Sequence, residues 1–261
     1  MRYKITVEYD GTNYCGWQKQ DGKFSIQETI EDSIKLITKE DVEVFGSGRT
    51  DAGVHALAQV AHFDIQKEIE PFRLMSAINF YLKSSYISRV ECNYMKKNGN
   101  VQDISITNCE IVDNDFHARF SAKKRRYRYR ILNRRQPTAL DNNRVWQVFR
   151  ELDFEKMQDS LQFLTGKRDW SSFRDSECQA KSPIKTIDKV SLRRDGDEII
   201  FEIEAKSFLH HMVRNIVGTI VEVGLGKISI QQFQDIIEAK DRTKAGPTAP
   251  AQGLYFVEVI Y

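Results

Sequence analysis

The stretch Phe45–Gly–Ser–Gly–Arg–Thr–Asp–Ala–Gly–Val–His–Ala56 holds one arginine, Arg49, and one carboxylate, Asp51, among three glycines. Glycine adopts backbone angles closed to other residues and lets another molecule approach the chain closely. Asp51 is the only acidic residue between Glu43 and Asp64, so no second carboxylate of this stretch shares acid–base work with it. A single carboxylate beside an arginine stays ionised and can act as a nucleophile.

A plain β-hairpin turn is the other interpretation of this stretch. The runs on its two sides, residues 42–45 and 59–65, have strand character, and Asp, Thr and Gly are residues that turns favour. In that case Asp51 bonds only its own backbone. Turn chemistry alone does not choose between the two interpretations.

Composition sets the broad class. A chain of 261 residues, 41% of them hydrophobic, can form one large or two small domains with a sizeable core. The net charge of +2 says little about partners. The four cysteines at positions 15, 92, 109 and 178 form no CxxC pair or metal-ligand spacing, which favours free thiols and no metal site. The first residues have no signal-peptide core, and no run reaches the ~18 apolar residues of a membrane span. We therefore expect a soluble, cytoplasmic protein.

Strands and helices alternate along the chain. Tyr3–Tyr9 alternates as a half-buried strand, and Ser25 with Glu28 forms a helix N-cap pattern before isoleucines at helical spacing. Further helices are predicted at 71–82, 154–164 and 209–223, and further strands at 189–193, 198–206 and 253–261. This order predicts an α+β protein with two similar lobes, residues 1–113 and 114–261, each an antiparallel sheet with helices on one side.

Residues 119–135 carry nine basic side chains and no acid. Within them Arg126, Arg128 and Arg130 share one face of a predicted strand, and Tyr127, Tyr129 and Ile131 share the other. One face can meet phosphates while the other offers rings for an unpaired base. A strand with a tyrosine-lined core and a solvated basic face is the alternative, but nine cations without an acid favour phosphate binding.

Several motifs together resemble the tRNA pseudouridine synthase A family, over nearly the whole chain. They are Tyr9–Asp–Gly–Thr–Asn–Tyr–Cys–Gly–Trp–Gln18, Gly48–Arg–Thr–Asp–Ala–Gly–Val–His–Ala56, Phe116–His–Ala–Arg–Phe–Ser121, Arg125–Arg–Tyr–Arg–Tyr129, His210–His–Met–Val–Arg–Asn–Ile–Val–Gly218, Ala239–Lys–Asp–Arg242 and Gly253–Leu–Tyr255, in the family's order. The resemblance implies a pseudouridine-synthase fold with a central basic cleft. It also implies a homodimer that isomerises uridine at positions 38, 39 and 40 of the tRNA anticodon stem-loop, without metal or organic cofactor.

The resemblance also implies roles for single residues. Asp51 is the nucleophile, Arg214 its ion-pair partner, and Tyr127 part of the target-base pocket. Leu254 lies near the target uracil or is a core leucine; both remain open. Arg49 holds the backbone of the flipped nucleotide or takes the vacated space, while Arg126 and Arg128 are the expected phosphate contacts. Independently, an arginine on a largely apolar helix such as 209–223 needs a partner, because an unpaired buried charge is costly.

Trp17, in a polar loop, is interpreted as a packing anchor, and Tyr129 as a core residue. Residues 83–102 depart from the family pattern as a polar insertion, for which a surface excursion is expected. His210 and His211 lack the spacing of a metal site, which favours structural hydrogen bonding. Two other function classes compete with the enzyme. An RNA-binding protein without catalysis would need no Asp51–Arg214 pair, and in a nucleotide-binding enzyme that cradles phosphate with residues 46–53, Asp51 would repel the phosphate.

Overall fold

The computed structural model describes residues 1–89 and 102–261, and the chain divides into two compact units. Unit 1 comprises Met1–Ala122 and Phe256–Tyr261, and unit 2 comprises Lys123–Tyr255. The boundary therefore lies after Ala122, whereas the sequence pattern predicted it after residue 113. Residues 114–122 belong to unit 1 because Ala118 makes two hydrogen bonds there. Its amide donates to the ring of His62, and its carbonyl accepts from the hydroxyl of Tyr261.

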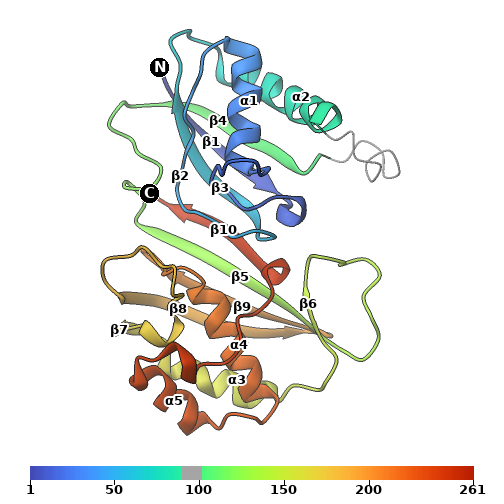
Figure 1. Ribbon diagram of the computed structural model, residues 1–261, viewed down its shortest axis with the longest axis vertical. Helices are drawn as coiled ribbons and strands as arrows, with labels where there is room; N and C mark the ends of the chain where they lie inside the picture. Colours follow the sequence, from blue (N-terminus) through green and yellow to red (C-terminus); the bar gives the residue numbers. More distant parts are fainter. Residues whose placement is uncertain (90–101) are drawn as a thin grey trace. The chain divides into compact units, whose positions relative to one another are not determined.

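Unit 1 is a sheet covered by two helices on one face (Figure 1). Antiparallel strands β1 (Arg2–Tyr9), β3 (His55–Asp64) and β4 (Ile104–Val112) lie in the order β4-β1-β3, with β10 (Leu254–Ile260) next to β3 and the short β2 (Phe45–Gly46) also paired to β3. The helices are α1 (Ile26–Thr38) and α2 (Pro71–Arg89), which contact each other. Alternate residues of β1 are buried, as its pattern predicted.

Unit 2 has the same composition of one sheet and a layer of helices (Figure 1). Strands β5 (Lys124–Asn133), β9 (Glu198–Ala205), β8 (Ile184–Asp195) and β7 (Gly166–Asp169) pair in that order and antiparallel, but β6 (Trp146–Val148) pairs parallel to β5. The helices α3 (Phe154–Ser160), α4 (Met212–Gly224) and α5 (Ile230–Ala239) contact one another. The fold is therefore α+β, and the expectation of purely antiparallel sheets fails at β6.

The helices differ from the prediction in several places: α3 ends at Ser160 and not at 164, and α4 begins at Met212 and not at 209. Helix α5 was not predicted, although Ser229 and Gln232 form a complete capping box at its start. Helix α2 continues to Arg89, so the predicted insertion at 83–102 begins as helix, and its residues 90–101 lie outside the described part of the chain. No helix of the described residues is long and apolar enough to cross a membrane.

His62 on β3 is a buried histidine in unit 1 whose surroundings disfavour protonation. Its ring lies 5.1 Å from that of Phe45 and 4.7 Å from that of His117. Its Nδ1 accepts a hydrogen bond from the amide of Ala118 at 3.2 Å, so this nitrogen carries no proton. Burial, with a smaller repulsion from His117 and Arg2, lowers the pKa of His62 to about 4.

We predict that stability falls as the pH is lowered from 6.5 to 4. In this window the unfolded chain, whose histidine pKa is about 6.5, binds a proton that folded His62 does not, so the free energy of unfolding falls by up to about 1.4 kcal/mol per pH unit. Urea denaturation across this range measures the slope. His62→Gln keeps an acceptor for Ala118 and should be less pH-sensitive; equal slopes in both proteins would exclude His62 as the cause.

Candidate active site

A buried side chain of β3 forms hydrogen bonds to the loop that carries Asp51. Gln59 is fully buried, its Nε2 donates to the carbonyl of Gly48 at 2.8 Å, and its Oε1 accepts from the hydroxyl of Ser47. The amide of Ser47 in turn donates to the carbonyl of Val60 at 2.7 Å. A buried amide that satisfies its hydrogen bonds in this way fixes the backbone it contacts. Ser47 and Gly48, which lead to Asp51, are therefore fixed on β3.

Residues 9–18 hold the same loop from the other side. The hydroxyls of Tyr9 and Thr50 are hydrogen-bonded at 2.8 Å, and the amide of Trp17 donates to the carbonyl of Thr50 at 3.1 Å. Gly16 forms an isolated β-bridge with Asp51. Burial raises the pKa of Tyr9, and the charge of Asp51 raises it further, so Tyr9 keeps its proton throughout the ordinary pH range.

Close packing explains two of the glycines. A Cβ on Gly46 would lie 2.5 Å from the ring of Trp17, and one on Gly16 would lie 2.4 Å from the carbonyl oxygen of Thr50. Gly16 also has φ of 108° and Gly53 φ of 77°, which favour glycine. Trp17 is 2% exposed, which confirms its predicted role as a packing anchor. Arg49 is exposed, and its Nε donates to Gln18 at 3.1 Å.

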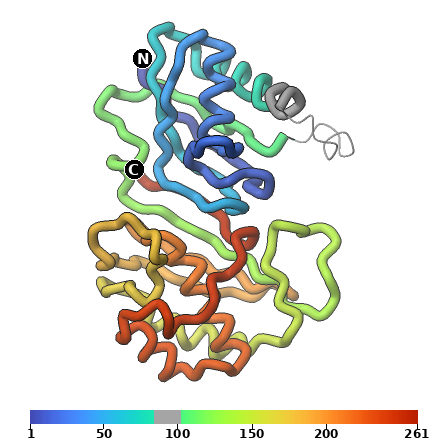
Figure 2. The backbone as a smooth tube through the Cα atoms, viewed as in Figure 1, coloured from blue at the N-terminus to red at the C-terminus, as the bar shows by residue number. Residues whose placement is uncertain are grey.

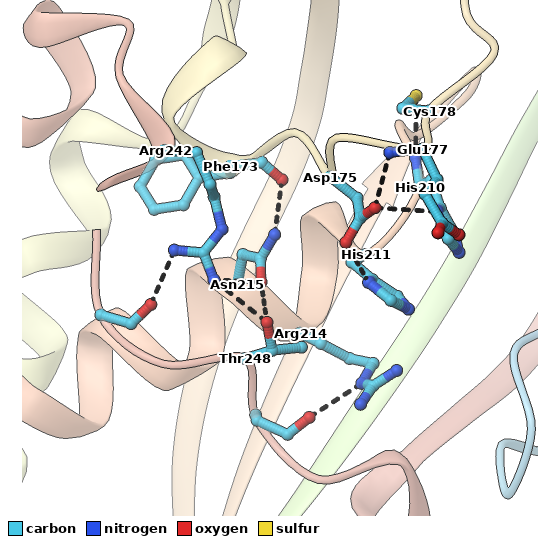
Figure 3. A network of polar contacts seen from close by, with 12 residues as sticks. Phe173, Asp175, Glu177, Cys178, His210, His211, Arg214, Asn215, Arg242 and Thr248 are labelled. Atoms are coloured by element: carbon cyan, nitrogen blue, oxygen red, sulfur yellow. Dashed lines mark hydrogen bonds and ion pairs between the residues drawn. The ribbon is translucent and has the colours of Figure 1, made fainter. Parts of the chain in front are cut away.

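In unit 2, Arg214 lies in the first turn of α4, where it is bonded to the segment that follows α5 (Figure 3). Its Nε donates to the carbonyl of Ala249 at 2.8 Å, and the amide of Ala249 donates to the carbonyl of Arg214 at 3.1 Å. Figure 2 shows this segment turning back past α4 before β10 begins. The side chain of Arg214 is thus oriented by a backbone carbonyl, a contact that the sequence pattern did not indicate.

The two histidines before α4 share one carboxylate, that of Asp175 (Figure 3). Nδ1 of His211 lies 2.7 Å from it and Nδ1 of His210 3.6 Å, and the two rings stack at 3.9 Å. Burial acts to raise the pKa of Asp175, but hydrogen bonds from the Glu177 amide and His211 outweigh it and hold the pKa below its usual range. The His211 imidazole is therefore hydrogen-bonded, as predicted, and the His210 imidazole lies at ion-pair distance from the same carboxylate, a partner that the sequence pattern did not indicate.

The basic face of β5 is matched by acids of the neighbouring strand β9. Nitrogen–oxygen distances are 3.1 Å for Arg126–Glu204, 2.7 Å for Arg128–Glu202 and 2.6 Å for Arg130–Glu198. These acids lie about 70 residues further along the chain, outside the local run of cations, so the sequence pattern did not indicate them. The face is a row of ion pairs on the described protein and not a surface of cations alone.

The other face of β5 is buried. Tyr129 is fully buried and donates its hydroxyl to the carbonyl of Pro250 at 2.6 Å, which confirms it as a core residue. Tyr127 is 8% exposed and meets the ring of Phe208 edge-on at 5.2 Å. Leu254, at the start of β10, is 5% exposed. Both side chains are therefore largely buried in unit 2.

Comparison with known proteins places this chain in a family. A family described as tRNA pseudouridine synthase matches residues 5–121 and 161–261. The chain belongs to the tRNA pseudouridine synthase A family. It is 49% identical over 262 residues to the tRNA pseudouridine synthase A of Wolbachia pipientis wMel, with all of both chains covered. It is 45% identical over 260 residues to that of Maricaulis maris (strain MCS10), covering 100% of this chain and 98% of the relative.

The protein is therefore a tRNA pseudouridine synthase, an isomerase. The loop that carries Asp51 and the helix that carries Arg214 both lie in the segments that match the family, whereas β5 lies between the two matched segments. Of the predicted site residues, Asp51 and Arg49 belong to unit 1, and the remaining five, Tyr127, Arg126, Arg128, Arg214 and Leu254, belong to unit 2.

Gly16→Ala should lower the free energy of unfolding of this synthase far more than Gly22→Ala does. Both residues have positive φ, but a Cβ on Gly16 meets the backbone of Thr50 and Asp51, whereas one on Gly22 meets nothing within 4 Å. We expect about 1–2 kcal/mol for Gly22→Ala from backbone strain alone, and more for Gly16→Ala. Urea denaturation measures both, and equal losses would show that Gly16 does not hold the Asp51 loop.

Proposed function

We propose that this synthase converts uridine to pseudouridine at positions 38, 39 and 40 of the tRNA anticodon stem-loop, with Asp51 as nucleophile. The observation that carries the proposal is the full-length similarity to relatives named tRNA pseudouridine synthase A. Local geometry supports the nucleophile, because the Asp51 loop is anchored on both sides by buried hydrogen bonds. A reactive group on such a rigid element can be placed accurately against its substrate.

Substrate binding requires the target nucleotide to leave the stem. A uridine stacked in a helix cannot be attacked, and flipping it out costs a few kcal/mol. We propose that Arg49, exposed beside the loop, holds the flipped backbone or takes the vacated space. Tyr127 and Leu254 would border the base, and their largely buried side chains support an apolar wall for the base.

The reaction exchanges one bond to the ribose for another. The carboxylate of Asp51 attacks either C1′ of the ribose or C6 of the uracil, and the bond between N1 and C1′ breaks. The base turns, C5 bonds to C1′ and the bond to Asp51 is released. The hydrogen on C5 leaves as a proton to solvent and N1 takes up a proton, so neither oxidant nor reductant is needed.

Arg214 would keep the nucleophile charged. We propose that its terminal nitrogens pair with the carboxylate of Asp51, since a guanidinium beside a carboxylate lowers the carboxyl pKa and aims its oxygens. The bond from Nε to the carbonyl of Ala249 supports this role, because it fixes the orientation of the guanidinium plane.

Asp51→Asn should abolish turnover and leave tRNA binding within about twofold, because a neutral amide keeps the shape but cannot attack. Release of tritium from C5 of labelled uridine in tRNA transcripts measures turnover, and filter binding measures affinity. Asp64→Asn is the matched control, because Asp64 lies on β3 in an exposed ion pair with Arg2. Turnover of Asp51→Asn within tenfold of wild type would exclude Asp51 as the nucleophile.

We propose that Arg126 and Arg128 also contact tRNA phosphates, while each guanidinium stays paired to its glutamate on β9. Their side chains are 35% and 32% exposed, which supports access for a phosphate.

Replacing both Arg126 and Arg128 by Gln should weaken tRNA binding. It should also reduce the salt dependence of tRNA affinity by about one unit of slope per lost phosphate contact. Glu202→Gln, which removes the acid beside Arg128, should tighten binding. Salt titrations of tRNA affinity test both, with the Arg168→Gln and Arg193→Gln double variant as control. An unchanged slope would mean that these arginines serve only their ion pairs.

The family resemblance further supports a homodimer in which one tRNA contacts both subunits, acting in the cytoplasm without a cofactor. Size-exclusion chromatography with light scattering, with and without tRNA, tests the assembly.

A further inference from the structure

We infer that Arg242 is a positioning residue that acts through Arg214: it holds the segment Ala245–Pro250 on α4, and this segment orients the Arg214 guanidinium. The inference rests on the role proposed above for Arg214. Arg242 follows α5 in the 3₁₀ turn Arg242–Lys244, which Asp241 caps by accepting from the amide of Thr243. It is half-buried.

The bonds of Arg242 all go to uncharged oxygens (Figure 3). Its Nη1 donates to the carbonyls of Gly246 at 3.0 Å and Ala245 at 3.5 Å. Its Nη2 donates to the hydroxyl of Thr248 and to Oδ1 of Asn215, both at 3.0 Å. Within the described chain the cation therefore serves as a planar set of donors that joins one segment to one helix. Lysine, a point charge without this fork, cannot reproduce the arrangement.

Asn215 completes the connection from within α4. Its side chain is fully buried; its Nδ2 donates to the carbonyl of Phe173 at 2.9 Å, and its Oδ1 accepts from Arg242 and from the hydroxyl of Thr248, the latter at 2.7 Å. The amide orientation is thus determined, since only the oxygen can accept from a guanidinium. Removing Arg242 would leave this acceptor short of a partner in a dry interior, which costs more than a surface bond.

The segment lies in close contact with α4 over one and a half turns. A Cβ on Gly218 would lie 1.8 Å from the carbonyl oxygen of Pro247, so only glycine permits this approach. The hydroxyl of Thr219 donates to the carbonyl of Asn215 at 2.8 Å and accepts from the amide of Gly246 at 3.0 Å. Backbone packing and side-chain bonds therefore define one position for the segment.

Ala249 transmits this position to Arg214. It follows Thr248 directly, so the bonds that hold Thr248 also hold the Ala249 carbonyl that accepts from Nε of Arg214 at 2.8 Å. On its other side, Pro250 accepts from the buried hydroxyl of Tyr129 at 2.6 Å. Because both neighbours of Ala249 are bonded, its carbonyl can shift only if a bond is lost at Thr248 or at Pro250. Thr248 is held by Arg242, which is half-buried, whereas Pro250 is held by Tyr129, which is fully buried.

The first test is Arg242→Lys, which retains the charge. We expect the single-turnover rate of C5 tritium release to fall between about 10-fold and 100-fold, as small misplacements of catalytic groups do, with tRNA affinity within about twofold. Arg168→Lys is the matched control, because Arg168 is exposed on β7 and, among the residues that the structure describes, bonds only to the nearby Thr165 carbonyl. A rate within twofold of wild type for Arg242→Lys would overturn the inference.

A double-mutant cycle separates positioning from general loss of structure. If Arg242 acts through Arg214, Arg242→Lys should change the rate less than about twofold in an Arg214→Lys background, because coupled residues are not additive. A full additional loss in that background would mean that Arg242 acts elsewhere, and would overturn the inference.

Hydrogen exchange tests the structural part without any activity. In wild type the amides of Gly246 and Ala249 are bonded to Thr219 and to Arg214 and should exchange slowly. In Arg242→Lys they should exchange at least tenfold faster while the buried amides of α4 are unchanged; unchanged protection would overturn the inference. If wild type released no tritium, the proposed reaction would fail, and the exchange result would still decide whether Arg242 holds the segment.

Discussion

A buried side-chain amide must make its hydrogen bonds inside the protein, and each unit of this synthase uses that constraint to orient one proposed catalytic residue. In unit 1 the amide is Gln59, which bonds the backbone of Gly48 and the hydroxyl of Ser47 just before Asp51. In unit 2 it is Asn215, which bonds Phe173, Arg242 and Thr248 next to Arg214. An unsatisfied group at either position would cost about 1–3 kcal/mol, so both arrangements resist displacement.

Electrostatics adds a second constraint. The arginines of β5 face glutamates of β9, so the surface that the sequence presents as a run of cations is close to neutral pair by pair, in keeping with a net charge of only +2. An RNA phosphate must therefore compete with or share a carboxylate, which favours a specific geometry of contact over attraction to net charge alone.

Local signals in the sequence predicted much of this structure. The Ser25 cap of α1, the alternation along β1 and the burial of Trp17 and Tyr129 follow from neighbouring residues or from hydrophobic spacing, and the structure confirms each of them. Helix α5 was missed although its capping box was visible. The glutamates of β9 and the carboxylate of Asp175 could not be assigned as partners, because strand pairing and the loop before α4 bring them close only in the fold.

The sequence by itself determined the family and many of the strands and helices, and it proposed the nucleophile, because motifs and periodic patterns are local properties of the chain. Only the tertiary structure decided what surrounds those residues. It showed that Gln59 holds the Asp51 loop, that the Ala249 carbonyl orients Arg214, and that Arg242 bonds no acid within the described residues. The partners in the first two of these contacts lie 11 and 35 residues apart along the chain, and such hydrogen-bond partners are chosen by packing and by the need to satisfy buried polar groups.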